Sequence, residues 1–191
     1  MTADIDIKRH WTAADYFGLD TEDRHEVIRG ELVMVPAPTS AHQRVITTLG
    51  AYITVFVIEN DLGQCFDTPI DVVLSDDVIV QPDFVFVSAR RVHEVVAQTS
   101  FIRGAPDLVI EVLSPSTARQ DRLTKRDLYA EAGVRWYLIV DVDQRLIEVF
   151  ELDDAGHYAT ARGANRDETL MLEAFPGLEI DLSKVWPAWQ P

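Results

Sequence analysis

The sequence predicts an α/β fold with a central strand that is covered on both sides. Residues 107–113 alternate with a period of two, and both faces of the expected strand are apolar except at Glu111. A strand of this kind is typical of the middle of a sheet that is covered on both sides. An amphipathic helix follows it and ends at Gly133, and residues 41–60 carry apolar side chains at helical spacing.

The composition is that of one globular domain. The chain has 191 residues, of which 47% are hydrophobic, and this is enough to bury a substantial core. The single cysteine, Cys65, excludes an intramolecular disulfide and fits a reducing cytosol. The first residues do not resemble a signal peptide, and no apolar run approaches the ~20 residues of a membrane helix. We therefore expect a single domain over residues 1–191, located in the cytoplasm and without a membrane partner.

The charge of the chain is strongly negative and unevenly distributed. A formal net charge of −15 argues at first against a nucleic-acid partner, which normally meets a basic surface. Residues 1–87 carry 5 Lys and Arg against 15 Asp and Glu, and residues 136–191 carry 4 against 11. Residues 88–135 instead carry 8 against 6. The basic-leaning part thus surrounds the expected strand and helix at 107–133, although an ordinary solvated helix face explains these charges equally well.

The N-terminal segment predicts a short helix and a hairpin. In residues 11–19, Thr12 is the expected N-cap and Asp15 completes a capping box. Residues 25–35 have the pattern of two short strands that turn near Gly30.

Two polar side chains of this half lie on faces that could be buried. Glu31 shares a strand face with Val33, and whether this face points inward or into solvent stays open. The helix expected over residues 41–60 begins after a proline-rich stretch with Ser40 as its cap. His42 lies on the core-facing edge of its first turn, where a polar boundary residue is more common than a ligand.

The sheet is expected to resume after this helix. Residues 64–74 and 78–80 have strand character, and residues 84–87 form another short apolar strand. Asp83 shares a face with Val85, so a carboxylate opens a buried strand directly after a proline. A turn or a cap is the alternative interpretation of Asp83, because Pro-Asp is common in turns.

The remaining elements are a helix around residues 91–98, a hairpin formed by residues 134–140 and 145–152, and a tail that ends near residues 182–186. The helix before the hairpin is expected to begin at Ser116 or Thr117. Its residue Lys125 lies at the edge of the buried stripe, so its amine can reach back toward the strand that carries Glu111.

Two carboxylates and one lysine are the groups that suggest chemistry. The sequence has no P-loop, dinucleotide-binding, zinc or nucleophile-elbow signature. Asp83 and Glu111 are 28 residues apart on strands with apolar neighbours, and Lys125 follows 14 residues later. Convergent carboxylates are ligands that Mg²⁺ prefers, together with water and phosphate oxygens, and an amine can stabilise charge on a phosphoryl oxygen. Glycosidases also use two carboxylates, but they do not need the lysine.

Several runs of the sequence resemble the Uma family of putative restriction endonucleases, a branch of the PD-(D/E)XK nuclease superfamily. The similarity extends over nearly the whole chain, and the Glu-Val-Leu-Ser-Pro-Ser-Thr run is its most specific part. The matching segments are residues 30–32, 40–43, 81–83, 110–117 and 121–125, with Tyr129 and Gly133.

The resemblance implies a restriction-endonuclease-like core, with a mixed central sheet flanked by helices, an N-terminal hairpin and a C-terminal β-hairpin. It also implies a metal-dependent phosphodiesterase site in which Asp83 and Glu111 are the two acids. In the superfamily pattern the lysine follows the second acid by two positions, and Leu113 occupies that position here. We expect the lysine to come from the next helix as Lys125.

The predicted function is that of an Mg²⁺- or Mn²⁺-dependent endodeoxyribonuclease, and the alternative is a catalytically silent nucleic-acid- or protein-binding module on the same fold. The expected catalytic residues are Asp83, Glu111 and Lys125. The expected metal ligands are Asp83, Glu111, Val112 and Glu31, and the expected substrate-binding residues are His42, Gln81, Arg119, Arg122 and Arg126. The expected substrate is DNA, bound weakly because the protein is acidic.

A homodimer is also expected, because two active sites related by a two-fold axis suit the cleavage of both strands of a duplex. Apolar surface from the C-terminal hairpin or tail, with Trp136, Trp186 and Trp189, would form the interface.

Overall fold

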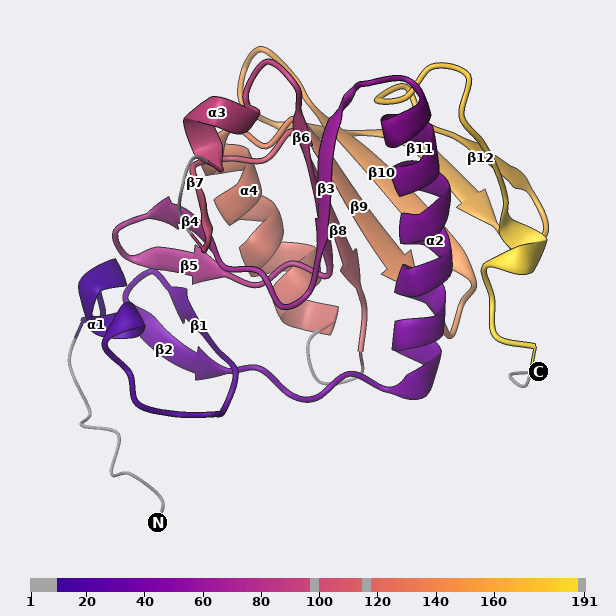
Figure 1. Cartoon of the computed structure of the whole chain (residues 1–191). Coiled ribbons are helices and arrows are strands. Elements are labelled where there is room, and N and C mark those ends of the chain that lie inside the picture. The colour runs from indigo at the N-terminus through magenta and orange to yellow at the C-terminus, as the bar shows by residue number, and fades with distance from the viewer. Residues whose placement is uncertain (1–9, 97–99, 115–117, 189–191) are drawn as a thin grey trace.

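The structure, a computed structural model, describes residues 10–96, 100–114 and 118–188. Its centre is a six-stranded sheet with the strand order β11-β10-β9-β8-β6-β3 (Figure 1). Strands β8 and β9 run parallel, and the other neighbouring pairs run antiparallel. The predicted mixed sheet is therefore confirmed. Its strands are β3 (Gly63–Asp67), β6 (Phe84–Ser88), β8 (Leu108–Val112), β9 (Trp136–Asp141), β10 (Leu146–Leu152) and β11 (Tyr158–Asn165).

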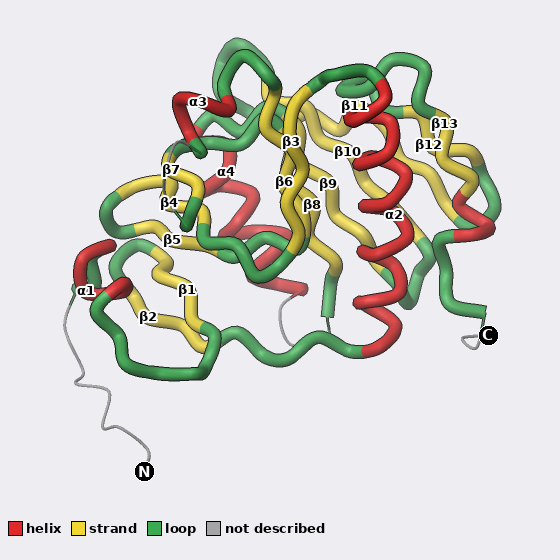
Figure 2. The backbone as a smooth tube through the Cα atoms, in the orientation of Figure 1, coloured by secondary structure: helices red, strands yellow, loops and turns green. Residues whose placement is uncertain are grey.

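A five-stranded sheet lies beside the central one, near the N-terminus (Figure 2). Its order is β2-β1-β5-β4-β7, and β1 and β2 form the predicted hairpin. Gly30 in the hairpin turn has a φ of +79°, and a Cβ there would lie 2.1 Å from Nδ1 of His10, so a side chain cannot be accommodated without rearrangement. The strands are β1 (His25–Ile28), β2 (Glu31–Met34), β4 (Val72–Ser75), β5 (Val78–Val80) and β7 (Ile102–Arg103).

Helices cover both faces of the central sheet, as the sequence predicts. The helix α2 (Ser40–Glu59) packs on one face, and α4 (Arg126–Ala132) lies on the other (Figure 1). Leu108 and Ile110 of β8 belong to the apolar core on the α2 side, whereas Val109 belongs to the core on the α4 side. The period of two therefore gives the two buried faces of β8.

The shorter elements complete the fold. They are α1 (Ala13–Phe17), α3 (Val92–Val95), the π-helix η1 (Gln120–Lys125), β12 (Thr169–Met171), β13 (Glu179–Asp181) and the 3₁₀-helix η2 (Leu182–Lys184). Thr12 and Asp15 form the predicted capping box of α1. Gly133 ends α4 with a φ of +86°, as expected for a helix C-cap. None of the described helices is long and apolar enough to cross a membrane.

Some sequence predictions are wrong in detail. Residues 64–74 form two strands of different sheets rather than one, because β3 ends at Asp67 and the chain passes through Pro69, which has no N–H for a ladder, before β4 begins. The cap of α2 is Thr39, whose hydroxyl accepts a hydrogen bond from the backbone N–H of His42 at 3.2 Å, and Ser40 is already helical.

Other predictions differ in extent or cannot be compared. In the described part of the segment predicted as a helix over residues 91–98, Val92–Val95 is helical. Residues 97–99 and the expected caps Ser116 and Thr117 lie outside the described residues. That the chain forms one domain stays a prediction.

The tryptophans expected at a dimer interface are buried within the chain itself. Trp136 is 7% exposed and Trp186 is 5% exposed, and both belong to the core on the α2 side. The indole N–H of Trp186 donates to the backbone carbonyl of Arg166 at 2.6 Å. Trp189 lies outside the described residues. Because both side chains are buried in the core of their own chain, Trp136 and Trp186 do not offer an apolar surface to a second copy.

Candidate active site

Asp83 and Glu111 lie opposite each other at the ends of two paired strands. Phe84 of β6 pairs with Ile110 of β8, and Val85 pairs with Val109, so Asp83, directly before β6, faces Glu111. Residues directly opposite on antiparallel strands project from the same face. Both side chains line one small cavity of about 50 Å³.

The side chain of Asp83 continues the β6–β8 pairing beyond the end of β6. Its Oδ2 accepts a hydrogen bond from the backbone N–H of Val112 at 2.7 Å. Pro82, the residue before Asp83, has no N–H with which to extend the ladder. The carboxylate of Asp83 is therefore held directly beside the strand that carries Glu111.

Lys125 reaches the same cavity from the helical segment after β8. Its Nζ lies 2.9 Å from Oε1 of Glu111 and 2.9 Å from Oε1 of Glu26, and 3.7 Å from Oδ1 of Asp121. The hydroxyl of Tyr129 donates to the same oxygen of Glu111 at 2.6 Å. The amine thus sits among three carboxylates from β1, β8 and η1.

The π-helix η1 is the local feature that aims these groups. Within it Asp121 and Lys125 are buried, whereas Leu123 is 57% exposed. The hydroxyl of Tyr137 on β9 donates to the backbone carbonyl of Asp121 at 2.9 Å, so this carbonyl of the π-helix has a hydrogen-bond partner on the sheet. Single π-turns occur often at functional sites.

The ionisable groups of the cluster shift one another's pKa values. Burial raises the pKa of Glu111 well above its usual value, and the carboxylates of Asp121, Asp83 and Glu26 raise it further against the opposing effect of Lys125. Burial by itself lowers the pKa of Lys125, but Glu111, Glu26 and Asp121 together outweigh it, so the pKa of the amine is well above its usual value. One ammonium therefore stays charged among an excess of carboxylates, and a cation would reduce their repulsion.

His42 and Gln81 also line this cavity. Nε2 of His42, on the first turn of α2, lies 3.0 Å from Oδ2 of Asp83, the oxygen that also accepts from the N–H of Val112. The backbone N–H of Gln81 donates to Oε1 of Glu26 at 2.8 Å. The side-chain oxygen Oε1 of Gln81 accepts a hydrogen bond from Nε of Arg24 at 2.9 Å. The two predicted residues thus contact carboxylates of this site, His42 through Asp83 and Gln81 through Glu26.

Glu26, Asp121, Tyr129 and Arg24 contribute to the cavity or its contacts, and sequence reasoning assigned none of them a role. Glu26 is 2% exposed. A signal for it was present: in the predicted hairpin it shares a strand face with Ile28, so a carboxylate lies on an apolar face, as at Glu111. Asp121 and Tyr129 belong to the family-like runs.

Glu31 does not join the cavity. It is exposed, begins β2 beside the hairpin turn and pairs with Ile28. Near a turn, a strand face meets solvent before it meets the core, so sharing a face with Val33 does not bury it. The buried glutamate of this hairpin is Glu26 on the other strand.

The predicted substrate-binding arginines also lie away from the cavity. Arg122 pairs with Glu148 and with Asp141, the latter at 3.2 Å, and Arg126 donates to the backbone carbonyl of Tyr158 at 2.9 Å. Both line a different cavity of about 420 Å³, and Arg119 is exposed. The reason is the helix surface: residues 121, 125 and 129 face inward, and these arginines lie on other faces.

The donor set fits a divalent cation that keeps several waters. Within the described residues no three His, Cys, Asp or Glu side chains come together in a way that could hold a metal ion by themselves. Two carboxylates and a backbone carbonyl are available, because the C=O of Val112 points to the same side of the strand as its N–H, which binds Asp83. A few carboxylates with water and phosphate oxygens are what Mg²⁺ commonly uses.

A comparison with protein families covers most of the chain. Residues 13–183 match the family Uma2, described as "Putative restriction endonuclease". The chain belongs to the Uma2 family. The resemblance found in the sequence is therefore confirmed.

Solved structures support the Uma2 fold. The chain is similar to the crystal structure of a putative nuclease belonging to DUF820 from Anabaena variabilis ATCC 29413, with a TM-score of 0.74 and 18% sequence identity. The match covers 91% of this chain and 96% of that one. No curated protein is significantly similar to the chain in sequence. At this identity the structural match supports the fold, and the predicted α/β class is confirmed.

Proposed function

We propose that this Uma2 member is a metal-dependent endonuclease that hydrolyses phosphodiester bonds of DNA. The observation that carries the proposal is that Asp83, Glu111 and the amine of Lys125 line one cavity, with Nζ of Lys125 2.9 Å from Glu111. The family description supports a nucleic-acid substrate. In this proposal the protein acts in the cytoplasm as a homodimer.

The ion would be held by Asp83, Glu111 and the carbonyl of Val112, and Mg²⁺ or Mn²⁺ is the expected species. A bound divalent ion polarises a phosphate and lowers the pKa of a bound water, which supplies a nucleophile near neutral pH. The excess of carboxylates over the single ammonium is what would attract it. His42 and Tyr129 each hold one oxygen of a ligand carboxylate, at 3.0 and 2.6 Å, and so limit the positions that these carboxylates can adopt.

Lys125 is the group proposed to stabilise the negative charge that develops on the phosphate. Its raised pKa keeps the amine protonated. Glu26 and Asp121 hold the ammonium in place, so little reorganisation is needed during the reaction. This lysine takes the part that Leu113 cannot take at the superfamily position.

The test is cleavage of DNA at low salt with Mg²⁺ and Mn²⁺ in turn, on linear, supercoiled and single-stranded substrates. Glu111→Gln is expected to remove nearly all turnover, because the acid holds the ion. Glu131→Gln is the matched control, since Glu131 on α4 is 58% exposed in its side chain and pairs with Arg29 at 2.6 Å on the surface. Equal background cleavage by wild type and Glu111→Gln on every substrate would reject the proposal.

One observation favours the alternative, a catalytically silent binding module. Lys125 is only 5% exposed, and its amine contacts three carboxylates around a cavity of about 50 Å³. A closed ion-pair cluster of this kind can be needed for folding without any chemistry, because the loss of one partner leaves a buried charge uncompensated. The same cleavage assay separates the two functions, because a silent module binds without any Glu111-dependent turnover.

A further inference from the structure

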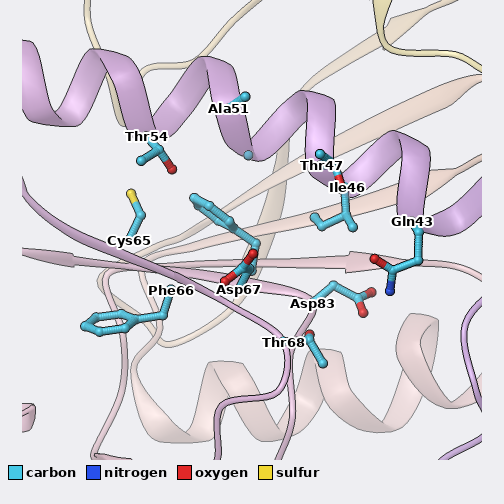
Figure 3. A pocket seen from close by; sticks show the side chains of 12 residues that line it. Gln43, Ile46, Thr47, Ala51, Thr54, Cys65, Phe66, Asp67, Thr68 and Asp83 are labelled. Carbon is cyan, nitrogen blue, oxygen red and sulfur yellow. The ribbon is translucent and has the colours of Figure 1, made fainter.

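A larger groove lies beside the candidate active site, between α2 and β3 (Figure 3). Its volume is about 320 Å³, and Asp83 lines both this groove and the smaller cavity. Figure 3 shows Gln43 and Asp83 at one end of the groove and Thr54 and Cys65 at the other. The groove therefore opens directly at the proposed ion site.

We propose that this groove binds one unpaired nucleobase of a single-stranded nucleic acid, next to the phosphate that is cut. The inference rests on the proposed nuclease function and adds a substrate class to it. The occupant would be a base whose own phosphate lies at Asp83.

The shape of the groove favours a single flat ring system. Its volume is near the lower end of the range for small-molecule sites, about 300–1,000 Å³, and two bases of a pair with their backbones would not enter. The helix approaches the sheet closely at Gly50, where an added Cβ would lie 3.2 Å from the ring of Phe84. Ala51, the next residue, is exposed and leaves the groove open.

The lining of the groove favours a neutral base over a phosphate. Gln43, Thr47 and Thr54 offer amide and hydroxyl groups that donate and accept hydrogen bonds. Burial raises the pKa of the Cys65 thiol to about 11, so this group stays neutral. Among the described residues that line the groove there is no lysine or arginine.

The acidic groups at the groove also favour a neutral base over a phosphate. Asp67, which lies outside the proposed ion site, repels a phosphate, whereas a carboxylate accepts hydrogen bonds from the amino groups of bases. Duplex binding depends on many phosphate contacts, which a chain with a net charge of −15 is poorly suited to make. A grip on an unpaired base supplies affinity without those contacts.

Hydrogen bonds connect the lining of the groove to the segment that carries Asp83. The hydroxyl of Thr68 donates to the backbone carbonyl of Pro82 at 2.8 Å, and its backbone N–H donates to the carbonyl of Asp83 at 3.3 Å. These bonds fix the segment after β3 to the turn that carries Asp83. A base held in the groove would therefore hold its phosphate in a defined position beside the two acids.

The test fills the groove without touching the acids. Ala51→Phe places a ring in the groove from an exposed position of α2, and Thr47→Phe is a second filled variant in case the first does not fold. Val55→Phe is the matched control, because Val55 lies one turn further along α2, is 54% exposed and is not among the residues that line the groove.

Binding is measured by fluorescence anisotropy with a labelled single strand of deoxycytidines, whose bases carry an amino group, at low salt and with Ca²⁺ in place of Mg²⁺. The comparison strands are an abasic strand of the same length and a duplex. Wild type and Val55→Phe are expected to bind the deoxycytidine strand about tenfold more tightly than the abasic strand, the order of effect of one bound base. The filled variants are expected to lose this preference.

Several results would overturn the inference. They are equal affinity of wild type for the deoxycytidine and abasic strands, no binding at all, a duplex that binds as tightly as the single strand, or filled variants that keep the preference. Cleavage assays in parallel separate the two proposals. If the base preference depends on the groove but no cleavage depends on Glu111, the groove proposal stands and the nuclease proposal is rejected. If cleavage depends on Glu111 but the base preference does not depend on the groove, only the groove proposal is rejected.

Discussion

Replacing Lys125 with methionine tests whether this amine balances the acidic cluster. Methionine keeps an unbranched, apolar stem and removes the ammonium, which lies 2.9 Å from Glu111, 2.9 Å from Glu26 and 3.7 Å from Asp121. Breaking a buried ion pair by removing one partner costs about 3–5 kcal/mol, because the remaining charge is uncompensated. A folded domain is stable by only about 5–15 kcal/mol, so the loss should be large.

The assay is thermal unfolding at neutral pH, with activity measured separately. For a chain of this size about 1 kcal/mol corresponds to roughly 2–4 °C, so the melting temperature of Lys125→Met should fall by about 6–20 °C. Millimolar Mg²⁺ or Mn²⁺ should recover more of the lost stability than it adds to wild type, because the cation replaces the missing positive charge. Cleavage should fall by roughly two to three orders of magnitude, the effect of one electrostatic contact.

Lys184→Met is the matched control, because Lys184 pairs with Asp181 on the surface and its side chain is 67% exposed. This change should leave the melting temperature unaltered. If Lys125→Met melts with wild type, or if divalent ions stabilise wild type and variant equally, then the amine does not balance the acids and the charge argument for an ion at this site is refuted.

Three further results are expected. Millimolar Mg²⁺ or Mn²⁺ should raise the melting temperature of wild type by mass action and less so for Asp83→Asn, and superimposable curves with and without metal would mean that Asp83 and Glu111 hold no ion. Burial raises the pKa of Tyr158, so the folded state keeps a proton that the unfolded state loses above its usual pKa of about 10, and stability falls as pH rises further. Urea unfolding at rising pH should show a decline that is shallower in Tyr158→Phe by up to about 1.4 kcal/mol per pH unit, and equal slopes would contradict this sign. Light scattering should report a homodimer, which a monomeric mass over a wide concentration range would exclude.

The sequence predicted the local structure well where periodicity and turn chemistry decide it. The alternation in residues 107–113 gives the two buried faces of β8, and Gly133 ends α4 where a positive φ is needed. It also indicated that Glu111 needs a partner and that Lys125 could reach it, because helix spacing places this lysine at the edge of the buried stripe. The family-like runs gave the mixed sheet and the Uma2 membership.

Local pattern failed where the direction of a side chain depends on distant elements. Glu31 and Glu26 lie on the same predicted hairpin, yet Glu26 is buried and Glu31 is exposed, because β5 pairs with β1 and leaves β2 at the edge of its sheet. Arg122 and Arg126 lie on the predicted helical segment, but Arg122 pairs with Glu148 and Arg126 donates to the carbonyl of Tyr158, both on later strands. No local period contains those partners.

The sequence by itself determined most of the strand and helix segments, and which acids and lysine stand out against apolar neighbours. Only the tertiary structure decided which side chains surround these residues. Glu26, Glu111 and Asp121 surround one amine because the chain brings β1, β8 and η1 together around Lys125. The physical reason is that side-chain alternation and helix spacing are properties of neighbouring residues, whereas a charge cluster is assembled by the packing of segments far apart in the chain.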